Sequence, residues 1–421
     1  YGLEDSLVQM NRELVALSKR AAGGRAYVAG DLTMTGRQLY PLGDLMFEDL
    51  VEVYKEQAKV ICEAGADLFV VETMMSLQEC RAAVIAIREV CDLPIMVSLT
   101  YNEDGRTLYG TDPATAVIVL QSLGADAVGL NCSTGPEAMI DPVQQMVEYA
   151  TIPLLAKPNA GMPELCDGVT VYRTTPEEFA SVGAKLVEAG AAIIGGCCGT
   201  TPEHIKAAYD LLEQAEIPKR ENIQIPAAVC SASEVVQIDQ PRIIGERINP
   251  TGKKRFKAAL QANDMDYILD QAVQQVDAGA DLLDVNVGMP GIDEKGMMIR
   301  TVKALQSIGG TPLQLDSTIP AVMEAALRVY NGKPIVNSVN GEEASLQNIL
   351  PLVKKYGAAV VGLTLDENGI PKKAADRFAI AKRILDRATA LGIPKRDVYI
   401  DCLTLTASAE QDGAKEIPHD V

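Results

Sequence analysis

The sequence predicts an α/β protein built from two consecutive (β/α)8 barrels, and three observations support this fold class. A Gly-Ala phrase recurs between a helix-like segment and a short apolar run, at residues 65–66, 124–125, 190–191, 279–280 and 357–358. A glycine suits the position just after a helix, and a short run of Val, Ile and Leu suits a buried parallel strand. Polar or reactive residues then follow strand after strand, as they do at the mouth of a barrel, whereas a doubly wound sheet gathers its ligands at one crevice.

Length and composition set the broad class of the protein. A chain of 421 residues is too long for one ordinary domain and fits two domains of about 200 residues. Apolar residues make up 48% of the chain and Trp is absent, so the cores are expected to be aliphatic. The formal net charge of -19 argues against a nucleic-acid partner or an anionic membrane surface. Nine cysteines in a chain of this size do not suggest a disulfide framework, which favours a cytoplasmic enzyme.

The strands can be assigned in chain order. The first half has candidate strands near 26–32, 68–73, 95–101, 127–132, 153–158 and 192–197. Prolines interrupt the helical pattern at 219–241, which we interpret as a linker between a domain at 1–218 and a domain at 242–421. The second domain has candidate strands at 243–249, 282–288, 313–317, 334–339, 359–365 and 398–404. Because a closed barrel needs eight strands, we expect each half to lack about two, and the chain to be a fragment cut through both barrels.

The most reactive stretch of the sequence is a pair of adjacent cysteines. Cys197 and Cys198 come after the apolar run 191–194 and before a helix start marked by Pro202. Cys132 ends another predicted strand of the same half. Three thiolates on two strand ends would make a zinc site whose fourth position is open to substrate, and only two histidines are available as alternative ligands. Adjacent cysteines can also be buried small apolar residues or a redox pair.

Two sets of motifs resemble known families. Gly-Leu-Asn-Cys at 129–132 together with Gly-Gly-Cys-Cys-Gly-Thr at 195–200 resembles the homocysteine S-methyltransferase signature. The stretch 245–252, followed by Asp-Val-Asn at 284–286 and Asp-Ser at 316–317, resembles the pterin-binding barrel of methyltetrahydrofolate methyltransferases. In this order the two resemble the N-terminal half of the cobalamin-dependent methionine synthase family. The resemblance covers almost all of the chain, but the first strands of the family's first barrel, the last two strands of its second, and its cobalamin-binding and reactivation modules have no counterpart.

The resemblance implies a methyltransferase that passes a methyl group from 5-methyltetrahydrofolate, through cobalamin, to zinc-bound homocysteine, giving methionine and tetrahydrofolate. A cobalamin-binding domain or protein outside this chain would be the partner. Cys132, Cys197 and Cys198 would hold the zinc, which would deprotonate a substrate thiol whose free pKa is about 8.5. Glu72, at another strand end, would hold the substrate ammonium group, with a solvated carboxylate or a helix cap as the alternative. Asn159, also at a strand end, ranks behind Glu72 as a substrate contact.

The second half carries polar residues at the ends of its predicted strands. A reduced pterin presents an edge of alternating donors and acceptors, which carboxylate and carboxamide side chains match with paired hydrogen bonds. The resemblance places on the pterin first Asp316, Asn337 and Asp401, and next Glu246, Asn249 and Asn286. A helix N-cap is the alternative for each of them, and above all for Asp316.

Two other functions stay open on the sequence. The thiol site could serve a homocysteine methyltransferase with another methyl donor, such as a betaine, or the chain could be a non-catalytic fragment that binds zinc and pterin. Folate binding by the second half separates the first alternative from the leading one. Metal content is the most informative measurement: we expect one zinc per chain, lost when Cys132 or Cys197 is replaced.

Overall fold

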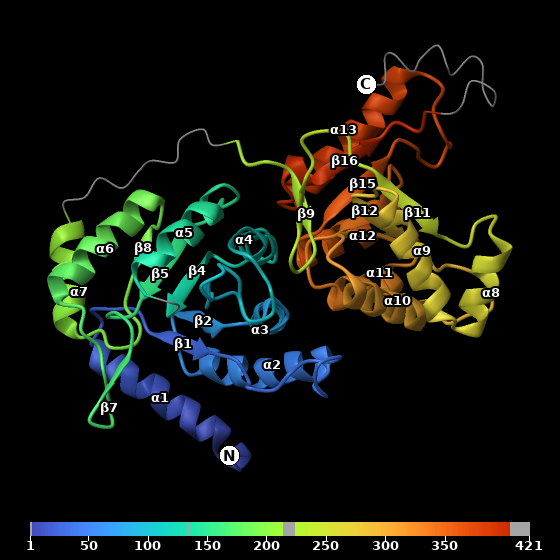
Figure 1. Ribbon diagram of the computed structural model, residues 1–421. Helices are drawn as coiled ribbons and strands as arrows, with labels where there is room; N and C mark the ends of the chain where they lie inside the picture. The colour runs from blue at the N-terminus through green and yellow to red at the C-terminus, as the bar shows by residue number, and fades with distance from the viewer. Residues whose placement is uncertain (1, 133–134, 214–223, 405–421) are drawn as a thin grey trace. The chain divides into compact units, whose positions relative to one another are not determined.

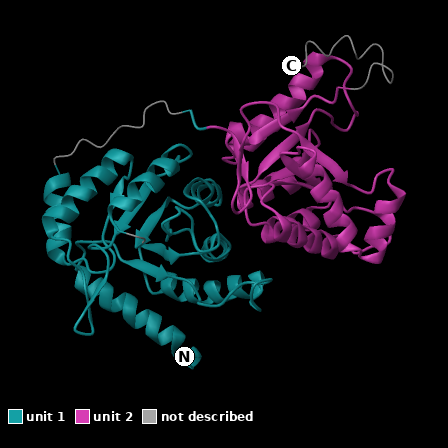
Figure 2. Cartoon of the chain, viewed as in Figure 1, with its two compact units in different colours: residues 1–225 teal, residues 226–421 magenta. Residues whose placement is uncertain are grey.

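The structure is a computed structural model that describes residues 2–132, 135–213 and 224–404 (Figure 1). The chain forms two compact units, one at residues 1–225 and one at residues 226–421 (Figure 2). Each unit has its own parallel sheet, its own helices and its own core. No helix within the described residues has both the length and the apolar character needed to cross a lipid bilayer.

The first unit contains a six-stranded sheet in which sequence order and spatial order coincide, β1-β2-β3-β4-β5-β8, with every neighbouring pair parallel. Its strands are β1 (Ala29–Leu32), β2 (Leu68–Met74), β3 (Ile95–Leu99), β4 (Ala127–Cys132), β5 (Leu154–Pro158) and β8 (Ile193–Ile194). Its α-helices are α1 (Leu7–Ala22), α2 (Phe47–Glu63), α3 (Leu77–Val90), α4 (Pro113–Ser122), α5 (Ile140–Val147), α6 (Pro176–Ala189) and α7 (Pro202–Leu212). A small antiparallel hairpin, β6 (Glu164–Cys166) and β7 (Val169–Val171), is inserted after β5.

The second unit repeats the arrangement with a six-stranded parallel sheet of order β11-β12-β13-β14-β15-β16. Its strands are β11 (Ile244–Ile248), β12 (Leu282–Val285), β13 (Leu313–Asp316), β14 (Ile335–Asn340), β15 (Ala359–Leu363) and β16 (Val398–Asp401). Its α-helices are α8 (Lys254–Ala262), α9 (Met265–Asp277), α10 (Glu294–Ile308), α11 (Pro320–Val329), α12 (Glu343–Tyr356) and α13 (Ala374–Ala390). Two partial barrels with six strands each confirm the predicted fold class.

The repeated Gly-Ala phrase has the structural role expected of it. Its five glycines all have positive φ, from 67° at Gly357 to 116° at Gly190. Glycine reaches this left-handed region without the steric cost of a Cβ, so each helix can end there and the chain can turn back into the sheet. The next residues form strands that are buried along most of their length, such as β4 and β12. The phrase therefore marks each helix-to-strand junction.

Close packing of β4 against β5 brings together the two strand ends that matter most for the site. A Cβ added at Gly129 would lie 1.7 Å from the Leu155 carbonyl oxygen, so no larger residue fits between the two backbones. Val128 and Leu130 on either side are fully buried. Burial of an aliphatic side chain of this size stabilises a fold by about 1.5–3 kcal/mol, and this packing fixes the positions of the strand ends.

The segment 219–241, which we interpreted as a linker, contains a hairpin in its described part. Strand β9 (Ala228–Cys230) pairs antiparallel with β10 (Val235–Gln237). Val229 and Val236 pack against residues at the starts of three strands, Leu282, Ile335 and Ala359. The hairpin therefore covers the amino-terminal end of the second sheet, opposite the end that carries the polar residues. The second unit begins at Pro226, whereas residues 214–223 lie outside the described residues.

Candidate metal centre and substrate sites

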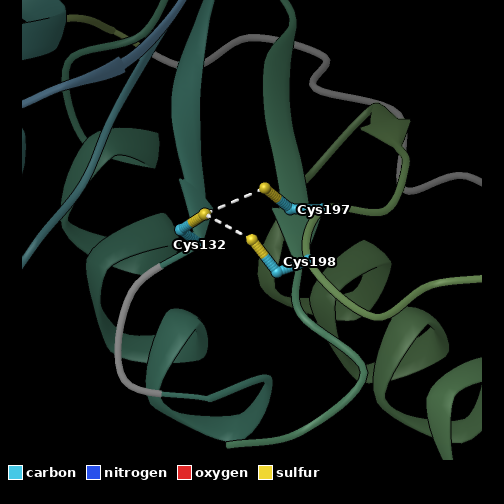
Figure 3. Close-up of side chains that lie close together, drawn as sticks. All are labelled: Cys132, Cys197 and Cys198. Carbon is cyan, nitrogen blue, oxygen red and sulfur yellow. Dashed lines mark hydrogen bonds between the residues drawn. The ribbon is translucent and has the colours of Figure 1, made fainter. Parts of the chain in front are cut away.

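Three thiols meet at the carboxyl-terminal edge of the first sheet (Figure 3). The Cys132 sulfur lies 2.9 Å from that of Cys197 and 3.7 Å from that of Cys198. The end of β5 joins the two cysteine segments. Pro158 pairs with Cys132 in the sheet, and its carbonyl oxygen accepts the Cys197 N–H at 2.9 Å. The thiols are therefore brought together by strand pairing rather than by nearness in sequence.

The backbone around the cysteines is tightly turned. Cys132 has a φ of 59°, which is uncommon for a residue other than glycine. The Cys198 N–H donates to the Asn159 side-chain oxygen at 3.0 Å. The Thr200 hydroxyl donates to the Cys197 carbonyl oxygen at 2.7 Å, and helix α7 begins at Pro202 as expected. This turn points both sulfurs of the pair toward Cys132.

The donor set fits a zinc ion. Tetrahedral zinc with Zn–S bonds of about 2.3 Å places its sulfur ligands about 3.8 Å apart. The Cys132–Cys198 separation already has this value, and the Cys132–Cys197 separation would have to open by roughly 1 Å. Within the described residues, this is the one group of three or more His, Cys, Asp or Glu side chains close enough to share an ion. His204 lies outside the group, because its ring caps α7 and contacts the Thr174 carbonyl oxygen.

The thiols do not share one electrostatic environment. Burial raises the pKa of the Cys132 thiol, and its two sulfur neighbours raise it further. Burial acts in the same direction on Cys197, but hydrogen bonds from Cys132 and Asn131 outweigh it and hold the pKa of Cys197 below its usual range. The Asn131 amide nitrogen lies 3.6 Å from that sulfur, and its oxygen accepts hydrogen bonds from Ser98 and Thr73. Asn131 therefore links strands β2 and β3 to the Cys197 thiol, whose pKa it helps to lower.

Glu72 lies inside the curved sheet, in an ion pair that the sequence did not suggest. Its carboxylate on β2 accepts from the ammonium group of Lys157 on β5. Both side chains are mostly buried, with exposed fractions of 27% and 18%. Asp31 on β1 is the next carboxylate, and burial raises its pKa while the charge of Lys157 opposes the rise. We missed Lys157 in the sequence, although a charge inside the apolar strand 154–158 was a usable signal.

The second sheet gathers polar side chains at its carboxyl-terminal end. The Asn286 amide donates to the Asp316 carboxylate at 2.9 Å. The Asp284 carboxylate accepts from Gln314 at 2.6 Å and from the Asn337 amide at 3.3 Å. Three of the residues expected on the pterin are thus brought together: Asn286 directly after β12, Asp316 at the end of β13 and Asn337 on β14. Asp316 does not cap the next helix, because α11 has Ile319 at its N-cap.

Asp284 and Gln314 are the members of this cluster that sequence reasoning did not single out as site residues. Both are buried, and a signal was available, since they precede Asn286 and Asp316 by two residues and so share the same strand face. Burial raises the pKa of Asp284 to about 6; the hydrogen bond from Gln314 opposes this, and the negative charge of Asp316 adds to it. Burial likewise raises the pKa of Asp316, against the effect of the Asn286 hydrogen bond.

The other three expected pterin residues make different contacts. Glu246 is exposed, lies 3.5 Å from the Lys253 ammonium group, and acts on the buried carboxylates through its charge. The Asn249 side-chain oxygen accepts the Thr251 N–H at 2.9 Å. The Asp401 carboxylate accepts the Leu403 N–H at 2.8 Å. The last two side chains therefore shape local turns and are not joined to the Asp316 cluster by hydrogen bonds.

Comparison with known proteins identifies the class to which the fold and site belong. Residues 1–212 match the family described as homocysteine S-methyltransferase, and residues 245–419 match the family described as pterin binding enzyme. The first match covers half of the chain, and the chain belongs to the homocysteine S-methyltransferase family. The matches confirm the resemblance found in the motifs.

The relatives join both parts in one protein. Methionine synthase of Mycobacterium tuberculosis (strain ATCC 25618 / H37Rv) is 32% identical over 435 residues, which cover 99% of this chain and 36% of that protein. Methionine synthase of Mycobacterium leprae (strain TN) is 32% identical over 441 residues, with the same coverage of both chains. This chain therefore spans 36% of the length of these curated relatives.

Two solved structures are each similar to about half of this chain. The apo homocysteine methyltransferase MmuM from Escherichia coli has a TM-score of 0.42 and 22% identity, covering 50% of this chain and 76% of its own. Dihydropteroate synthase from Xanthomonas albilineans, in complex with indole-2-carboxylic acid and 6-chloroguanine, has a TM-score of 0.36 and 21% identity, covering 46% of this chain and 71% of its own.

Proposed function

We propose that this chain supplies the homocysteine-binding and folate-binding parts of a cobalamin-dependent methionine synthase. The methyl group of 5-methyltetrahydrofolate would pass through cobalamin to homocysteine, giving methionine and tetrahydrofolate. The observation that carries the proposal is the convergence of three cysteine sulfurs within 4.8 Å of one another at the carboxyl end of a parallel sheet. This is the edge at which barrel enzymes hold their active sites.

Cys132, Cys197 and Cys198 would hold a zinc ion and leave one coordination position for the substrate sulfur. When bound, the ion supplies Lewis-acid chemistry, which lowers the pKa of a coordinated thiol so that the thiolate forms at neutral pH. The chain's own residues prepare the site: Asn131 contacts the Cys197 sulfur and Asn159 fixes the Cys198 backbone. Such supporting contacts orient metal ligands.

Glu72 would hold the ammonium group of homocysteine. It lies in the same sheet interior as the thiols, and its present partner, Lys157, is itself a primary ammonium group. A mostly buried carboxylate that already pairs with one ammonium group is suited to pair with another. This pairing supports an ammonium-binding role for Glu72.

The polar cluster of the second unit would hold the pterin. Asp316, Asn286 and Asn337 present carboxylate oxygens and amide groups on three neighbouring strands, which suits an edge of alternating donors and acceptors. We extend the proposal to Glu246 within β11, Asn249 directly after it, and Asp401 at the end of β16. These three would have to exchange their local contacts for the ligand.

Cobalamin, bound by a separate domain or protein, would supply the methyl carrier between the two substrates. We also propose a cytoplasmic location, because the site needs reduced thiols and the cytoplasm maintains them. Cys132, Cys197 and Cys198 form no disulfide in the structure, as the proposed metal site requires.

Metal content and methyl transfer test the proposal together. The 421-residue chain is expected to hold one zinc, to transfer methyl from added methylcobalamin to homocysteine, and to lose both properties in Cys198→Ala. Cys166→Ala is the matched control, because Cys166 lies on the β6–β7 hairpin, outside the cluster. Methyl transfer that persists in Cys198→Ala would show that the zinc mechanism is wrong.

The alternative methyl donor remains the second candidate, and the second unit argues against it. Binding of methyltetrahydrofolate by the chain, weakened in Asp316→Ala, would favour the folate donor over a betaine. A chain that binds both zinc and folate yet transfers no methyl group from methylcobalamin would be a binding fragment only.

A further inference from the structure

Lys157 is a charged residue in the interior of the first unit that the proposed chemistry does not use. It lies on β5 in the otherwise apolar stretch Leu-Leu-Ala-Lys-Pro. Its partner Glu72 lies on β2, and the order β2-β3-β4-β5 places two whole strands between them. Side chains on strands this far apart meet across the concave interior of a curved sheet. The ion pair therefore spans the space in front of β3 and β4, and β4 ends at Cys132 of the thiol site.

The stem of Lys157 runs past the cysteine pair. A Cβ added at Gly195 would lie 3.0 Å from the Lys157 Cγ and 3.2 Å from its Cδ. Gly195 precedes Cys197 by two residues, so the lysine stem packs beside the turn that presents the thiols. Burial lowers the pKa of Lys157, whereas the negative charges of Cys197 and Asp31 oppose that change. The ammonium group thus pairs with Glu72 on β2 and also faces Asp31 on β1.

We propose that Lys157 is a specificity-determining residue that occupies the ammonium subsite at Glu72, so that the α-ammonium group of homocysteine replaces it there when the substrate binds. The inference rests on the proposed function, because it takes Glu72 as the ammonium partner. An unpaired carboxylate would be costly in this half-buried place beside Asp31, and Lys157 supplies the same chemical group that the substrate brings. Once displaced, the lysine ammonium group would still have Asp31 as a neighbouring carboxylate.

Competition of this kind lowers the benefit that a ligand gains from its own ammonium group. Homocysteine has to displace Lys157 from Glu72, whereas 4-mercaptobutyrate, which has the same thiol and carboxylate but no ammonium group, does not. Removing the lysine charge leaves Glu72 available, so the ammonium group of a ligand should then contribute more to its binding affinity. Lys157→Met keeps an unbranched stem to pack against Gly195, and we expect it to raise the preference for homocysteine by about tenfold.

The test uses the 421-residue chain with Co2+ in the thiol site, where a bound thiolate changes the visible absorption of the metal. Dissociation constants are measured for homocysteine and for 4-mercaptobutyrate, and their ratio reports the value of the ammonium group. We expect the ratio to rise about tenfold in Lys157→Met, not to rise in the charge-preserving Lys157→Arg, and to fall to about one in Glu72→Gln. The cobalt spectrum without ligand shows whether each variant retains the thiol site, and Lys157→Gln replaces Lys157→Met if the latter does not fold.

The outcomes separate this inference from the function on which it rests. If both thiols bind and the ratio in Lys157→Met or Lys157→Gln equals that of the wild type or is lower, the inference is wrong and the proposed function stands. If neither thiol changes the cobalt spectrum of the wild type, the proposed homocysteine site is wrong and the inference falls with it.

Discussion

Asp284→Asn should make the stability of the second unit less dependent on pH. The Asp284 side chain is 2% exposed, and its carboxylate accepts hydrogen bonds from Gln314 and Asn337. Asparagine has nearly the same shape, and its amide oxygen can accept both bonds. The substitution therefore removes the ionisable group and keeps the contacts.

The expected magnitude follows from the raised pKa. Burial raises the pKa of Asp284 from 3.8 to about 6, so the folded chain holds this proton more tightly than the unfolded chain does. The stabilisation is complete below pH 3.8 and is lost as the pH rises through about 6. The full loss is on the order of 3 kcal/mol, of which about 1.4 kcal/mol falls between pH 5 and pH 8. Asp284→Asn should not show this loss.

Hydrogen exchange followed by mass spectrometry measures the local stability of the second sheet. Peptides that cover β12 and β13 report the opening free energy of the second sheet, at pH values of 5 and above so that the chain stays away from its isoelectric point near 4.6. The difference in opening free energy between Asp284→Asn and the wild type should grow by about 1.4 kcal/mol from pH 5 to pH 8, in favour of the variant. Asp270→Asn is the control, because Asp270 is exposed on α9.

Two results would refute this reasoning. Equal pH slopes in the wild type and Asp284→Asn would show that Asp284 does not carry the raised pKa. A variant less stable than the wild type at pH 8 would show that the fold needs the ionised carboxylate, in which case the hydrogen bonds from Gln314 and Asn337 outweigh the cost of burial.

Three further predictions concern packing, folate and metal. Gly129→Ala places a Cβ 1.7 Å from the Leu155 carbonyl oxygen and should destabilise the first unit by more than about 4 kcal/mol in urea unfolding. The control is Gly183→Ala in α6, where the added Cβ meets only side-chain atoms at 3.7 Å and beyond. This control should be neutral or slightly stabilising. Asp316→Ala leaves Asn286 without its carboxylate partner and should weaken methyltetrahydrofolate binding by about 10- to 100-fold in calorimetry. The cobalt spectrum of the thiol site should not change. An affinity equal to that of the wild type would place the pterin elsewhere. Removal of metal by a chelator should speed hydrogen exchange in the first unit and not in the second, and a uniform change would contradict a site confined to the thiols.

Much of the fold was readable from the sequence because its signals are local. A glycine at positive φ followed by an apolar run specifies a helix end and a strand start within a few residues, and the range predicted at 68–73 is observed as Leu68–Met74. The two hairpins were not predicted, because their three-residue strands are too short to show a period. The β9–β10 hairpin was also disguised by the prolines around it, which made the segment read as a linker.

The candidate sites also have some features that the sequence predicted and others that it did not. Polar residues at strand ends could be placed from the sequence, and the three cysteines were expected to meet because their strands end at one edge. The strand register confirms that the thiols lie together, through Pro158. Asn249 and Asp401 also lie at strand ends, but their side chains turn to the nearest backbone N–H. A residue's position at a strand end therefore does not determine its hydrogen-bond partner.

The sequence by itself determined the alternation of helices and strands, the division into two halves, and the edge of each sheet at which reactive side chains gather, since each of these depends on residues a few positions apart. Only the tertiary structure decided that Lys157 pairs with Glu72 and that Asp284 lies buried beside Gln314 and Asn337. Those pairings depend on the register and curvature that bring side chains of separate strands into one enclosed space. The low polarity of that space then sets which charges persist there and which partners they need.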